Sequence, residues 1–476
     1  KERQILVTSA LPYANGPIHI GHMVEYIQTD IWVRFMRNSN HEVLSFCADD
    51  AHGAPIMMKA DELKIKPTDF IDQMKKDHQD SLKKFGIEYT NYHSTHSNEN
   101  EKLVSEIFLD AKNSGHIYKE DVEQCFDEEK KMFLADRYVT GDCPKCGAEN
   151  QYGDGCDSCG ATYSATEIIN PKSSLSGTKP ITKISEHIFF DLKKSKSNLK
   201  KFLKTASIQD SVVGKLSEWL ESGLKDWCFT RDEPYFGFEV PGSQKKYYYV
   251  WFDAPIGYIA ATSEWCQKNS RSLSEFWKDP GCEIYHNIGK DIIYFHSLFW
   301  PAMLKSADFT LPSEIMVHGM LTVGGEKLSK SKGTFINART YLDFLSPDYL
   351  RYYFACKLTD SSADLDLSWD DFLSRVNSDL VGKITNLASR GVQMLAKHFD
   401  SELGSFDEEG KKLLLKTQNA HETIANYYEK RQFAKAMLLI RELVDDANKY
   451  FDTYEPWKLV KEDKEAVHKI LTSIVH

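Results

Sequence analysis

Short apolar runs and one long amphipathic stretch alternate over the first fifty residues. Gln4–Ser9 (QILVTS) is a run typical of a short buried strand, and residues 42–48 (EVLSFCA) predict a second one. Between them, apolar residues recur at helical spacing, at Val24, Ile27, Ile31 and Phe35. A strand, a helix and a strand in this order indicate a βαβ unit within a parallel sheet.

Further along, the pattern divides the chain into an interrupted α/β part and a helical part. Helical spacing marks residues 68–85 and 98–114, and residues 115–227 then bring a cysteine cluster and many Gly and Ser residues. Apolar runs that predict strands resume afterwards: KYYYVWF (246–252), CEIYHNI (282–288) and EIMVHGMLTV (314–323). From about Ser346 onward we expect helices only, with the short links of a bundle.

Composition narrows the classes of protein. Of 476 residues, 41% are hydrophobic and 27% are charged, which is a globular rather than a disordered mix. The net charge of −11 excludes a strongly basic protein that coats nucleic acid, although a local basic face can still bind RNA. No apolar run reaches the length of a membrane span. Ten cysteines are too few for a disulfide scaffold, so we expect a reducing cytoplasm.

The segment PIHIGH (17–22) follows the first predicted strand and opens the first predicted helix. Open α/β sheets bind ligands at this position, and a helix start offers free N–H groups to phosphate. His19 and His22 are three residues apart and share one helix face, and Gly21 lets a flat ring approach the backbone. The alternative is a pair of ordinary surface histidines.

The segment KLSKSKGT (327–334) follows the last predicted strand and a Gly-Gly pair. Its lysines, Lys327 and Lys330 among them, can close over a polyphosphate and hold a departing pyrophosphate. A solvated basic loop is the commoner identity of such a run. The two motifs together are more specific than either one, because each follows a strand.

Four cysteines have metal-ligand spacing, C-x2-C-x9-C-x2-C: Cys143, Cys146, Cys156 and Cys159. Four thiolates make a closed tetrahedral shell, which suits one structural Zn²⁺ and leaves no open catalytic position. The alternatives are two disulfides or four free thiols. The other six cysteines are scattered and are expected to be packing residues.

The pair PIHIGH and KLSKS resembles the HIGH and KMSKS motifs of the class I aminoacyl-tRNA synthetases, with Leu328 in place of Met. The resemblance implies that His19 and His22 stabilise the transition state at the α-phosphate of ATP and that Lys327 and Lys330 hold pyrophosphate. Mg²⁺ is implied with ATP. By the same resemblance, the ATP-binding residues are His19, Gly21, His22, Gly289, Asp291, His318 and Lys330.

Three further segments resemble the methionyl-tRNA synthetases within that class: ALPYANG (10–16), VWFDAPIGY (250–258) and GKDIIYFHSLFWPAML (289–304). The insertion of about 110 residues is too small for the editing domain of the leucine, isoleucine and valine enzymes. Asp50 is implied as the partner of the substrate ammonium. The implied L-methionine pocket consists of Ala10, Leu11, Tyr13, Asp50, Trp251, Ala254, Pro255, Tyr258, Ile292, His296 and Trp300.

The resemblance also implies a tRNA partner, tRNA(Met) including the initiator tRNA. Asn386 and Arg390 lie four apart on one predicted helix and can reach one base edge. Trp457 can stack on an unpaired anticodon base. The alternative is that the polar residues only face solvent on a helix and that Trp457 is a packing residue. We expect neither a DNA nor a membrane partner, and a monomer.

These inferences combine into one predicted architecture: a Rossmann-like parallel-sheet α/β catalytic domain, split by a zinc-knuckle insertion and followed by an all-α anticodon-binding bundle. The predicted boundaries are 1–114 and 228–345 for the catalytic halves, 115–227 for the insertion and 346–476 for the bundle, which we expect to be truncated.

Three alternatives stay open. One is another class I synthetase without an editing domain. A second is a small-molecule nucleotidyltransferase, and a third is a zinc-knuckle RNA-binding protein without catalysis.

Overall fold

The computed structural model describes residues 2–153, 155–156, 158–159, 161, 163–329 and 333–476. By its internal contacts the chain forms two compact units. The first unit comprises Lys1–Ile18, Glu42–Ser81 and Glu88–Val317, and the second comprises His19–His41, Leu82–Ile87 and His318–His476. The four predicted segment boundaries are not tested by this division and stay a prediction.

A six-stranded sheet forms the centre of the first unit. Its strand order is β10-β15-β14-β1-β2-β3. The strands are β1 (Gln4–Ser9), β2 (Glu42–Asp49), β3 (Asn91–Ser94), β10 (Ser207–Ile208), β14 (Cys282–Gly289) and β15 (Glu314–His318). β1 pairs in parallel with β14 and with β2, and β2 pairs in parallel with β3. The predicted parallel α/β sheet is confirmed.

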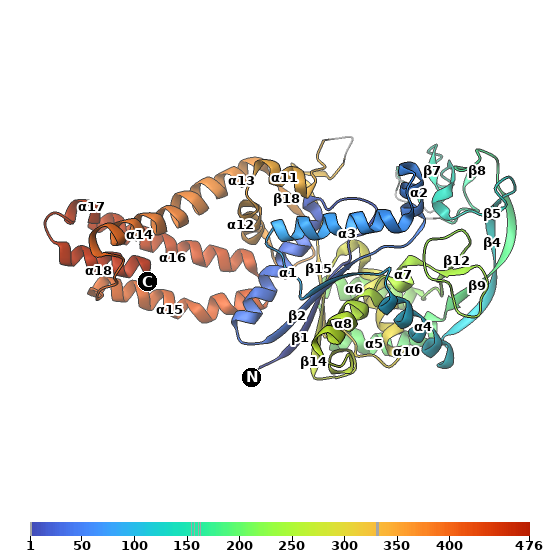
Figure 1. Ribbon diagram of the computed structural model, residues 1–476, viewed down its shortest axis with the longest axis horizontal. Helices are drawn as coiled ribbons and strands as arrows, with labels where there is room; N and C mark the ends of the chain where they lie inside the picture. Colours follow the sequence, from blue (N-terminus) through green and yellow to red (C-terminus); the bar gives the residue numbers. More distant parts are fainter. Residues whose placement is uncertain (1, 154, 157, 160, 162, 330–332) are drawn as a thin grey trace. The chain divides into compact units, whose positions relative to one another are not determined.

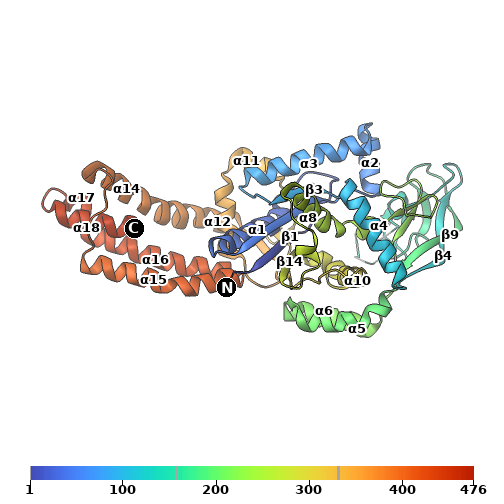
Figure 2. The same cartoon turned by 60° about the horizontal axis from the view of Figure 1, so that its bottom comes forward.

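The two α/β stretches also contribute helices. They are α2 (Ala54–Leu63), α3 (Pro67–Lys84), α4 (Asn98–Asn113), α7 (Val250–Asp253), α8 (Ile256–Asn269), α9 (Ser274–Trp277) and α10 (Trp300–Ser306). Of these, α8 and α9 contact strands of this sheet. Leu6, Phe46 and Ile284 of the sheet share one apolar core with Val104 of α4 and Ile259 of α8. Figure 2 shows α8 beside the strands it covers. The apolar runs predicted as strands are therefore largely buried in the structure.

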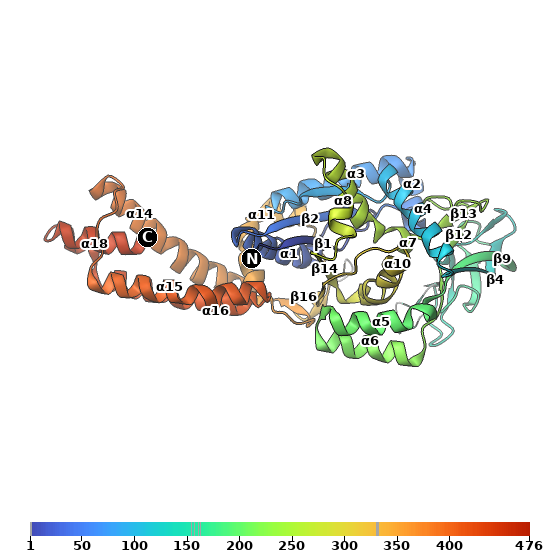
Figure 3. The same cartoon turned by 90° about the horizontal axis from the view of Figure 1, so that it is seen from below.

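The stretch between α4 and α7 adds small antiparallel sheets and the helices α5 (Lys196–Thr205) and α6 (Asp210–Ser222). The sheets consist of β4 (Ile117–Asp127), β5 (Met132–Phe133), β6 (Val139–Asp142), β7 (Gln151–Tyr152), β8 (Ile169–Ser173), β9 (Ile181–Phe190), β11 (Trp227–Cys228), β12 (Thr230–Asp232) and β13 (Lys246–Tyr248). β4 and β9 form a long antiparallel ribbon. Helices α5 and α6 lie side by side (Figure 3).

Helices dominate the second unit. Its helices are α1 (Ile20–Asn38), α11 (Ala338–Phe344), α12 (Pro347–Lys357), α13 (Trp369–Ser374), the π-helix η5 (Arg375–Thr385), α14 (Asn386–Phe399), α15 (Glu408–Glu429), α16 (Phe433–Tyr454), α17 (Pro456–Leu459) and α18 (Lys464–Val475). Figure 1 shows α14, α15, α16 and α18 packed as a bundle, and Leu387, Phe451 and Leu471 lie in its core. The predicted C-terminal helical bundle is confirmed.

Two local predictions are wrong. The run EIMVHGMLTV is not one strand, because β15 ends at His318 and β16 (Leu321–Val323) joins another sheet. A Cβ on Gly319 would lie 2.0 Å from the carbonyl oxygen of Ala363, so the chain passes too close there for any side chain. The region after Ser346 is not only helical, because β18 (Leu365–Leu367) pairs with β16.

The remaining strand, β17 (Glu326–Lys327), pairs with β16 and leads into the KLSKS segment. KYYYVWF is strand only at β13, and its VWF residues begin α7. Within the part of the chain that the structure describes, every helix is too short or too polar to traverse a lipid bilayer.

Candidate functional site

All residues predicted for the amino-acid pocket lie in the first unit. They come from the loop after β1 (Ala10, Leu11, Tyr13), the end of β2 (Asp50), α7, α8 and their junction (Trp251, Ala254, Pro255, Tyr258), and the segment before and within α10 (Ile292, His296, Trp300). The carboxyl ends of parallel strands meet at one sheet edge, which is where such folds bind ligands. The structure thus collects the predicted residues at the expected edge.

Tyr258 and His296 form a buried hydrogen-bonded pair. The Tyr258 hydroxyl lies 2.8 Å from Nε2 of His296, and Nδ1 of His296 lies 3.2 Å from the carbonyl oxygen of Ile292. A carbonyl only accepts, so Nδ1 carries the proton and Nε2 accepts from the phenol. Burial lowers the pKa of His296 to about 4. The imidazole is therefore neutral and its orientation is fixed from both sides.

Aromatic side chains form much of the surrounding wall. The Trp251 and Phe295 rings stack with centroids 4.2 Å apart and planes 11° apart. Trp300 is fully buried and lies 6.4 Å from Tyr258 between ring centroids. Ala10, Leu11 and Ile292 pack on the same core. Polarisable, apolar walls of this kind suit a flexible thioether side chain.

Three buried carboxylates lie at the end of β2 and in α7. Nδ1 of His78 lies 2.8 Å from Oδ1 of Asp49, and Nδ1 of His52 contacts Asp253. Asp50, in contrast, forms no ion pair with any described residue, and its Oδ1 is buried without a hydrogen-bond partner. Each neighbouring carboxylate has its own histidine, so Asp50 is the one that lacks a cationic partner among the described side chains.

The environment of Asp50 disfavours its charged form. Burial raises its pKa well above the ordinary value, and the charges of Asp253 and Asp49 raise it further, while the N–H of His52 opposes them. Tyr13 pairs with Asp50 in an isolated β-bridge, and its hydroxyl donates to the His52 carbonyl at 2.9 Å. A buried carboxylate in this state is stabilised by a cation that enters the pocket.

Sequence patterns missed the side chains that hold these groups. His286 on β14 accepts a hydrogen bond from Nε1 of Trp300 at 3.0 Å, and His78 and His52 hold the two neighbouring aspartates. No spacing rule identifies them, because each acts across elements distant in sequence. The one available signal was the presence of His286 in an otherwise apolar strand, because His52 lies in a loop and His78 in a polar helix.

Gly289 and Asp291, predicted to contact adenosine and ribose, lie at the same sheet edge. Gly289 is the last residue of β14, and Asp291 lies in the 3-10 helix η3 (Lys290–Ile292) that follows it. Asp291 is exposed. Its carboxylate can therefore accept hydrogen bonds from sugar hydroxyls.

In the second unit, His19 and His22 form the N-terminal cap of α1. Nδ1 of His19 accepts from the N–H of Gly21, and Nδ1 of His22 accepts from the N–H of His19, both at 3.1 Å. The two rings stack with centroids 3.7 Å apart. Because both Nδ1 atoms accept, the proton of each neutral ring lies on Nε2, which is a donor suited to phosphate oxygens.

The structure also brings the two motifs together within the second unit. A Cβ on Gly21 would lie 2.7 Å from Cδ1 of Leu328, so any side chain there would displace the Leu328 side chain. Lys327 is exposed at the end of β17. The Thr334 hydroxyl donates to the Lys327 carbonyl at 2.8 Å and accepts from the N–H of Ser329 at 2.9 Å. Lys330 lies outside the described residues.

His318, predicted for the adenine side, is buried in the second unit. Its Nε2 lies 3.0 Å from Oε2 of Glu25, and its Nδ1 lies 2.8 Å from the carbonyl oxygen of Gly319. Both ring nitrogens thus lie within hydrogen-bond distance of oxygen atoms.

The four predicted cysteines converge. The Sγ atoms of Cys143 and Cys159 lie 3.8 Å apart, those of Cys146 and Cys156 lie 3.6 Å apart, and all four lie within 4.8 Å of one another. Zn–S bonds of about 2.3 Å require sulfurs about 3.8 Å apart in a tetrahedron. Gly147 has φ +74, which permits the turn after the first pair. This cluster can hold a metal ion.

The predicted anticodon residues lie on α14 and α17. The Arg390 guanidinium lies 4.8 Å from the Trp457 ring centroid and 4.6 Å from that of Phe451. Oδ1 of Asp452 lies 3.6 Å from Nη2 of Arg390. Trp457 is 39% exposed and Asn386 is exposed. The Trp457 ring is thus partly exposed to solvent, and the Arg390 guanidinium lies over it.

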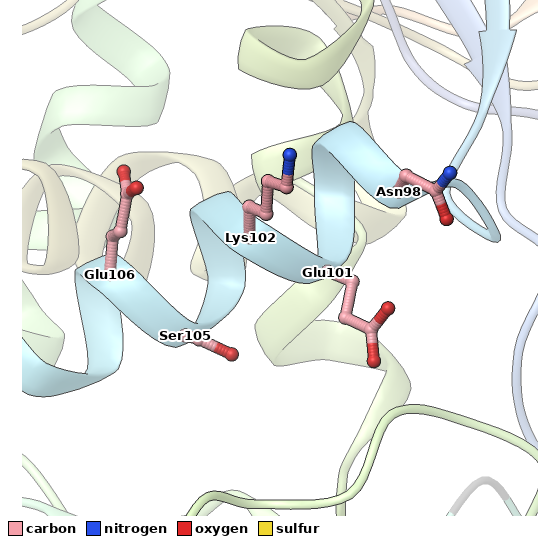
Figure 4. Close-up of a pocket in the computed structure, with 5 residues that line it drawn as sticks. All are labelled: Asn98, Glu101, Lys102, Ser105 and Glu106. Atoms are coloured by element: carbon pink, nitrogen blue, oxygen red, sulfur yellow. The ribbon is translucent and has the colours of Figure 1, made fainter.

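A hollow of about 470 Å³ along α4 contains none of the predicted site residues. It is lined by Asn98, Glu101, Lys102, Ser105 and Glu106 (Figure 4). All five side chains come from one helix, and charged and polar groups line it instead of the apolar walls of a ligand pocket. We assign it no function.

Comparison with known proteins gives a family and a fold. The family model described as "tRNA synthetases class I (M)" matches residues 5–392. The structure of Mycobacterium tuberculosis methionyl-tRNA synthetase in complex with methionyl-adenylate has a TM-score of 0.80 and 24% identity, over 99% of this chain and 88% of that chain.

Two further structures of the Mycobacterium tuberculosis enzyme are similar. A second one bound by methionyl-adenylate has a TM-score of 0.79 and 23% identity, over 100% of this chain and 88% of that chain. The apo form has a TM-score of 0.71 and 23% identity, over 100% of this chain and 86% of that chain. At these identities the likeness establishes the fold.

Proposed function

This chain belongs to the class I tRNA synthetases of the (M) group, whose family model spans residues 5–392, and on that premise we propose that it is a methionine-tRNA ligase. The single observation that carries the proposal is the buried Asp50 carboxylate, which has no ion-pair partner among the described residues and lies close to Asp253 of α7, the helix that also carries Trp251. Two of the structures it resembles are of a methionyl-tRNA synthetase bound to methionyl-adenylate. A zwitterionic, apolar amino acid matches both halves of this site.

In the first step, a carboxylate oxygen of methionine attacks the α-phosphorus of ATP. The bond from that phosphorus to the β-phosphate oxygen breaks, and pyrophosphate leaves. The carboxylate is ionised at neutral pH, so no general base is required. We propose that Asp50 binds the ammonium, Tyr258 and His296 line the thioether side, and the remaining predicted pocket residues shape the cavity.

The motif residues take up the charge that develops on the phosphates. We propose that the Nε2–H groups of His19 and His22 donate to oxygens of the α-phosphate, where charge increases in the transition state. Lys327, with Lys330 from the same motif, holds the departing pyrophosphate. Mg²⁺ bound with ATP supplies further neutralisation of the polyphosphate. Gly289, Asp291 and His318 hold the nucleoside.

In the second step, a ribose hydroxyl at the 3′ end of tRNA(Met) attacks the carbonyl carbon of the adenylate. The hydroxyl loses its proton and AMP leaves. We propose that residues 346–476 read the anticodon, with Asn386 and Arg390 at a base edge and Trp457 stacked on a base. Residues 1–114 and 228–345 then carry the activation chemistry.

ATP–pyrophosphate exchange with each of the twenty amino acids tests the first step. We expect methionine alone to drive exchange. Exchange driven by a different amino acid indicates another class I synthetase. Exchange without any transfer to tRNA favours the nucleotidyltransferase alternative, and no ATP turnover favours the RNA-binding one.

The cysteine cluster is proposed to bind one structural Zn²⁺. Metal analysis of the purified chain should find about one zinc per molecule. Cys146→Ser removes a ligand and should lower that value to near zero, because three thiolates hold the ion weakly. Cys228→Ser, outside the cluster, is the matched control and should keep the zinc. Two disulfides in place of the metal would contradict the proposal.

A further inference from the structure

One buried histidine joins the walls of the amino-acid pocket and belongs to none of the motifs. His286 lies on β14, three residues before Gly289, and its side chain has no exposed surface. It faces the apolar core on the side of the sheet that packs against α8 and α10. Trp300 and Tyr258, two predicted pocket residues, both contact it.

Hydrogen bonds fix the His286 ring on both sides. Nε1 of Trp300 donates to Nε2 of His286 at 3.0 Å, so the imidazole proton lies on Nδ1. Nδ1 in turn contacts Oγ1 of Thr8 on the neighbouring strand β1. Burial holds the pKa of His286 well below its ordinary value, with the nearby His296 adding to this effect. The ring is therefore a neutral, single tautomer that ties Trp300 to the sheet.

The same ring supports the second wall of the pocket. The Tyr258 ring stacks on His286 with centroids 5.1 Å apart, and the His296 ring lies 6.1 Å away, edge-on. Tyr258 also donates to His296. His286 thus lies against three of the predicted pocket residues, Trp300, Tyr258 and His296, although it is not itself predicted to touch the substrate.

We propose that His286 is a positioning residue that holds Trp300 and Tyr258 in place and thereby sets the discrimination of methionine from other apolar amino acids. This inference rests on the proposed function. Discrimination between apolar side chains of similar size is limited to about 10- to 200-fold per methylene, so it depends on walls that do not move. A Trp ring that loses its hydrogen bond can rotate and admit a branched side chain.

A matched pair of substitutions separates the two hydrogen bonds. In His286→Gln, the side-chain carbonyl reaches the position of Nε2 and can accept from Trp300. In His286→Asn, the shorter amide reaches only the position of Nδ1, so it can contact Thr8 but leaves the indole N–H buried without an acceptor. The two variants differ by one methylene and keep a neutral amide in the core.

The measured quantities are KM and kcat for methionine and for leucine, and KM for ATP, by pyrophosphate exchange. For His286→Asn we expect KM for methionine to rise roughly 10-fold and the methionine-to-leucine ratio of kcat/KM to fall roughly 10-fold. For His286→Gln we expect KM for methionine and the methionine-to-leucine ratio of kcat/KM to stay within about 3-fold of wild type. KM for ATP should stay unchanged in both.

A merely structural role predicts a different outcome. Both variants would then melt at lower temperature but keep the wild-type selectivity, and that result would overturn the proposal. If His286→Asn does not fold, Trp300→Phe provides the second test, because it removes the indole N–H and leaves His286 in place. A folded Trp300→Phe enzyme with unchanged KM for methionine and unchanged selectivity also overturns it.

The wild-type enzyme separates this inference from the proposed function. If another amino acid drives exchange in the wild type, the assignment to methionine fails, and the same variants are then measured with that amino acid. Selectivity lost in His286→Asn but retained in His286→Gln still supports the positioning role. If the wild type activates methionine and His286→Asn keeps the wild-type selectivity, the positioning role is refuted and the proposed function is not.

Discussion

The proposed amino-acid pocket and the proposed anticodon surface both contain a tryptophan, but the two side chains have opposite environments. In the pocket, Trp300 is fully buried and its N–H donates to His286. On the anticodon surface, Trp457 is 39% exposed and is supported from one side by the Arg390 guanidinium and the Phe451 ring. One ring is fixed within a core, and the other presents a face to solvent.

The difference follows from what each region is proposed to recognise. A methionine side chain has no strong hydrogen-bonding group, so the protein must supply a rigid shape with its own polar atoms already satisfied. An unpaired RNA base has its own hydrogen-bonding edge and a flat face, and stacking tolerates small movements. Preorganisation is therefore worth more in the pocket than on the surface.

The charged side chains of the two regions, Asp50 and Arg390, also differ in burial. Asp50 is buried, where an ion pair with a substrate ammonium is shielded from salt. Arg390 is partly exposed and lies 3.6 Å from Asp452, so its charge is screened and shared. Removing charge should thus have a larger effect in the pocket than removing an aromatic ring has on the surface.

The largest effect is expected from Asp50→Asn. The amide keeps the shape but cannot pair with the substrate ammonium, and breaking a buried ion pair costs about 3–5 kcal/mol. We expect kcat/KM for methionine in pyrophosphate exchange to fall about 150- to 5000-fold. Asp110→Asn, an exposed aspartate on α4, is the control and should match wild type. Unchanged methionine kinetics in Asp50→Asn would remove Asp50 from the site.

Trp457→Ala should have the next largest effect, and only on tRNA. Stacking on one base contributes about 1–3 kcal/mol, so kcat/KM for tRNA in aminoacylation should fall roughly 10- to 100-fold. Pyrophosphate exchange should be unaffected. Trp369→Ala is a matched control, because Trp369 is 40% exposed on a different helix. An equal loss in both variants would mean that Trp457 has no specific role.

Tyr258→Phe tests the hydrogen bond inside the pocket. Loss of the hydroxyl leaves Nε2 of His296 buried without its donor, which costs about 1–2 kcal/mol. We expect KM for methionine to rise roughly 10-fold, with tRNA and ATP kinetics unchanged. Tyr118→Phe removes a hydroxyl bonded to Asp226 elsewhere in the first unit and should change none of these constants. Equal methionine kinetics in Tyr258→Phe and Tyr118→Phe would show that the hydrogen bond between Tyr258 and His296 does not contribute to methionine binding.

The smallest effect is expected from pH on methionine binding. The pKa of His296 is lowered to about 4, so its ring stays neutral and adds no pH dependence to KM for methionine from pH 8 to about 6. The pKa of Asp50 is raised by burial, so any pH dependence of KM in this range should be lost in Asp50→Asn. The unfolded chain, with an ordinary histidine pKa near 6.5, binds the proton first. The contribution of His296 to stability is therefore complete above about pH 6.5 and declines toward pH 4. A midpoint near pH 6.5 in KM that persists in Asp50→Asn would show that a pocket imidazole titrates.

Local patterns predicted a large part of the fold. The apolar run at Gln4–Ser9 is β1 with the same bounds, and the helical spacing after Gly21 corresponds to α1. The four cysteines converge as their spacing indicated. Each of these signals is contained in a few neighbouring residues, so it survives without knowledge of the rest of the chain.

Local patterns failed where the decisive contact is distant in sequence. The break between β15 and β16 depends on the close passage of Ala363 at Gly319, and β18 depends on its pairing with β16. Neither partner can be read from the apolar run itself. Short strands in particular take their conformation from the strand beside them.

The sequence by itself determined the parallel α/β sheet, the C-terminal helical bundle, the cysteine cluster and the family, because hydrophobic periodicity and motif spacing are local properties. The tertiary structure alone decided that Asp49 and Asp253 each meet a histidine while Asp50 meets none, and that His286 ties Trp300 to the sheet. Burial and hydrogen-bond partnership arise only when strands and helices far apart in the chain pack together, and these properties set the charge and rigidity of the site.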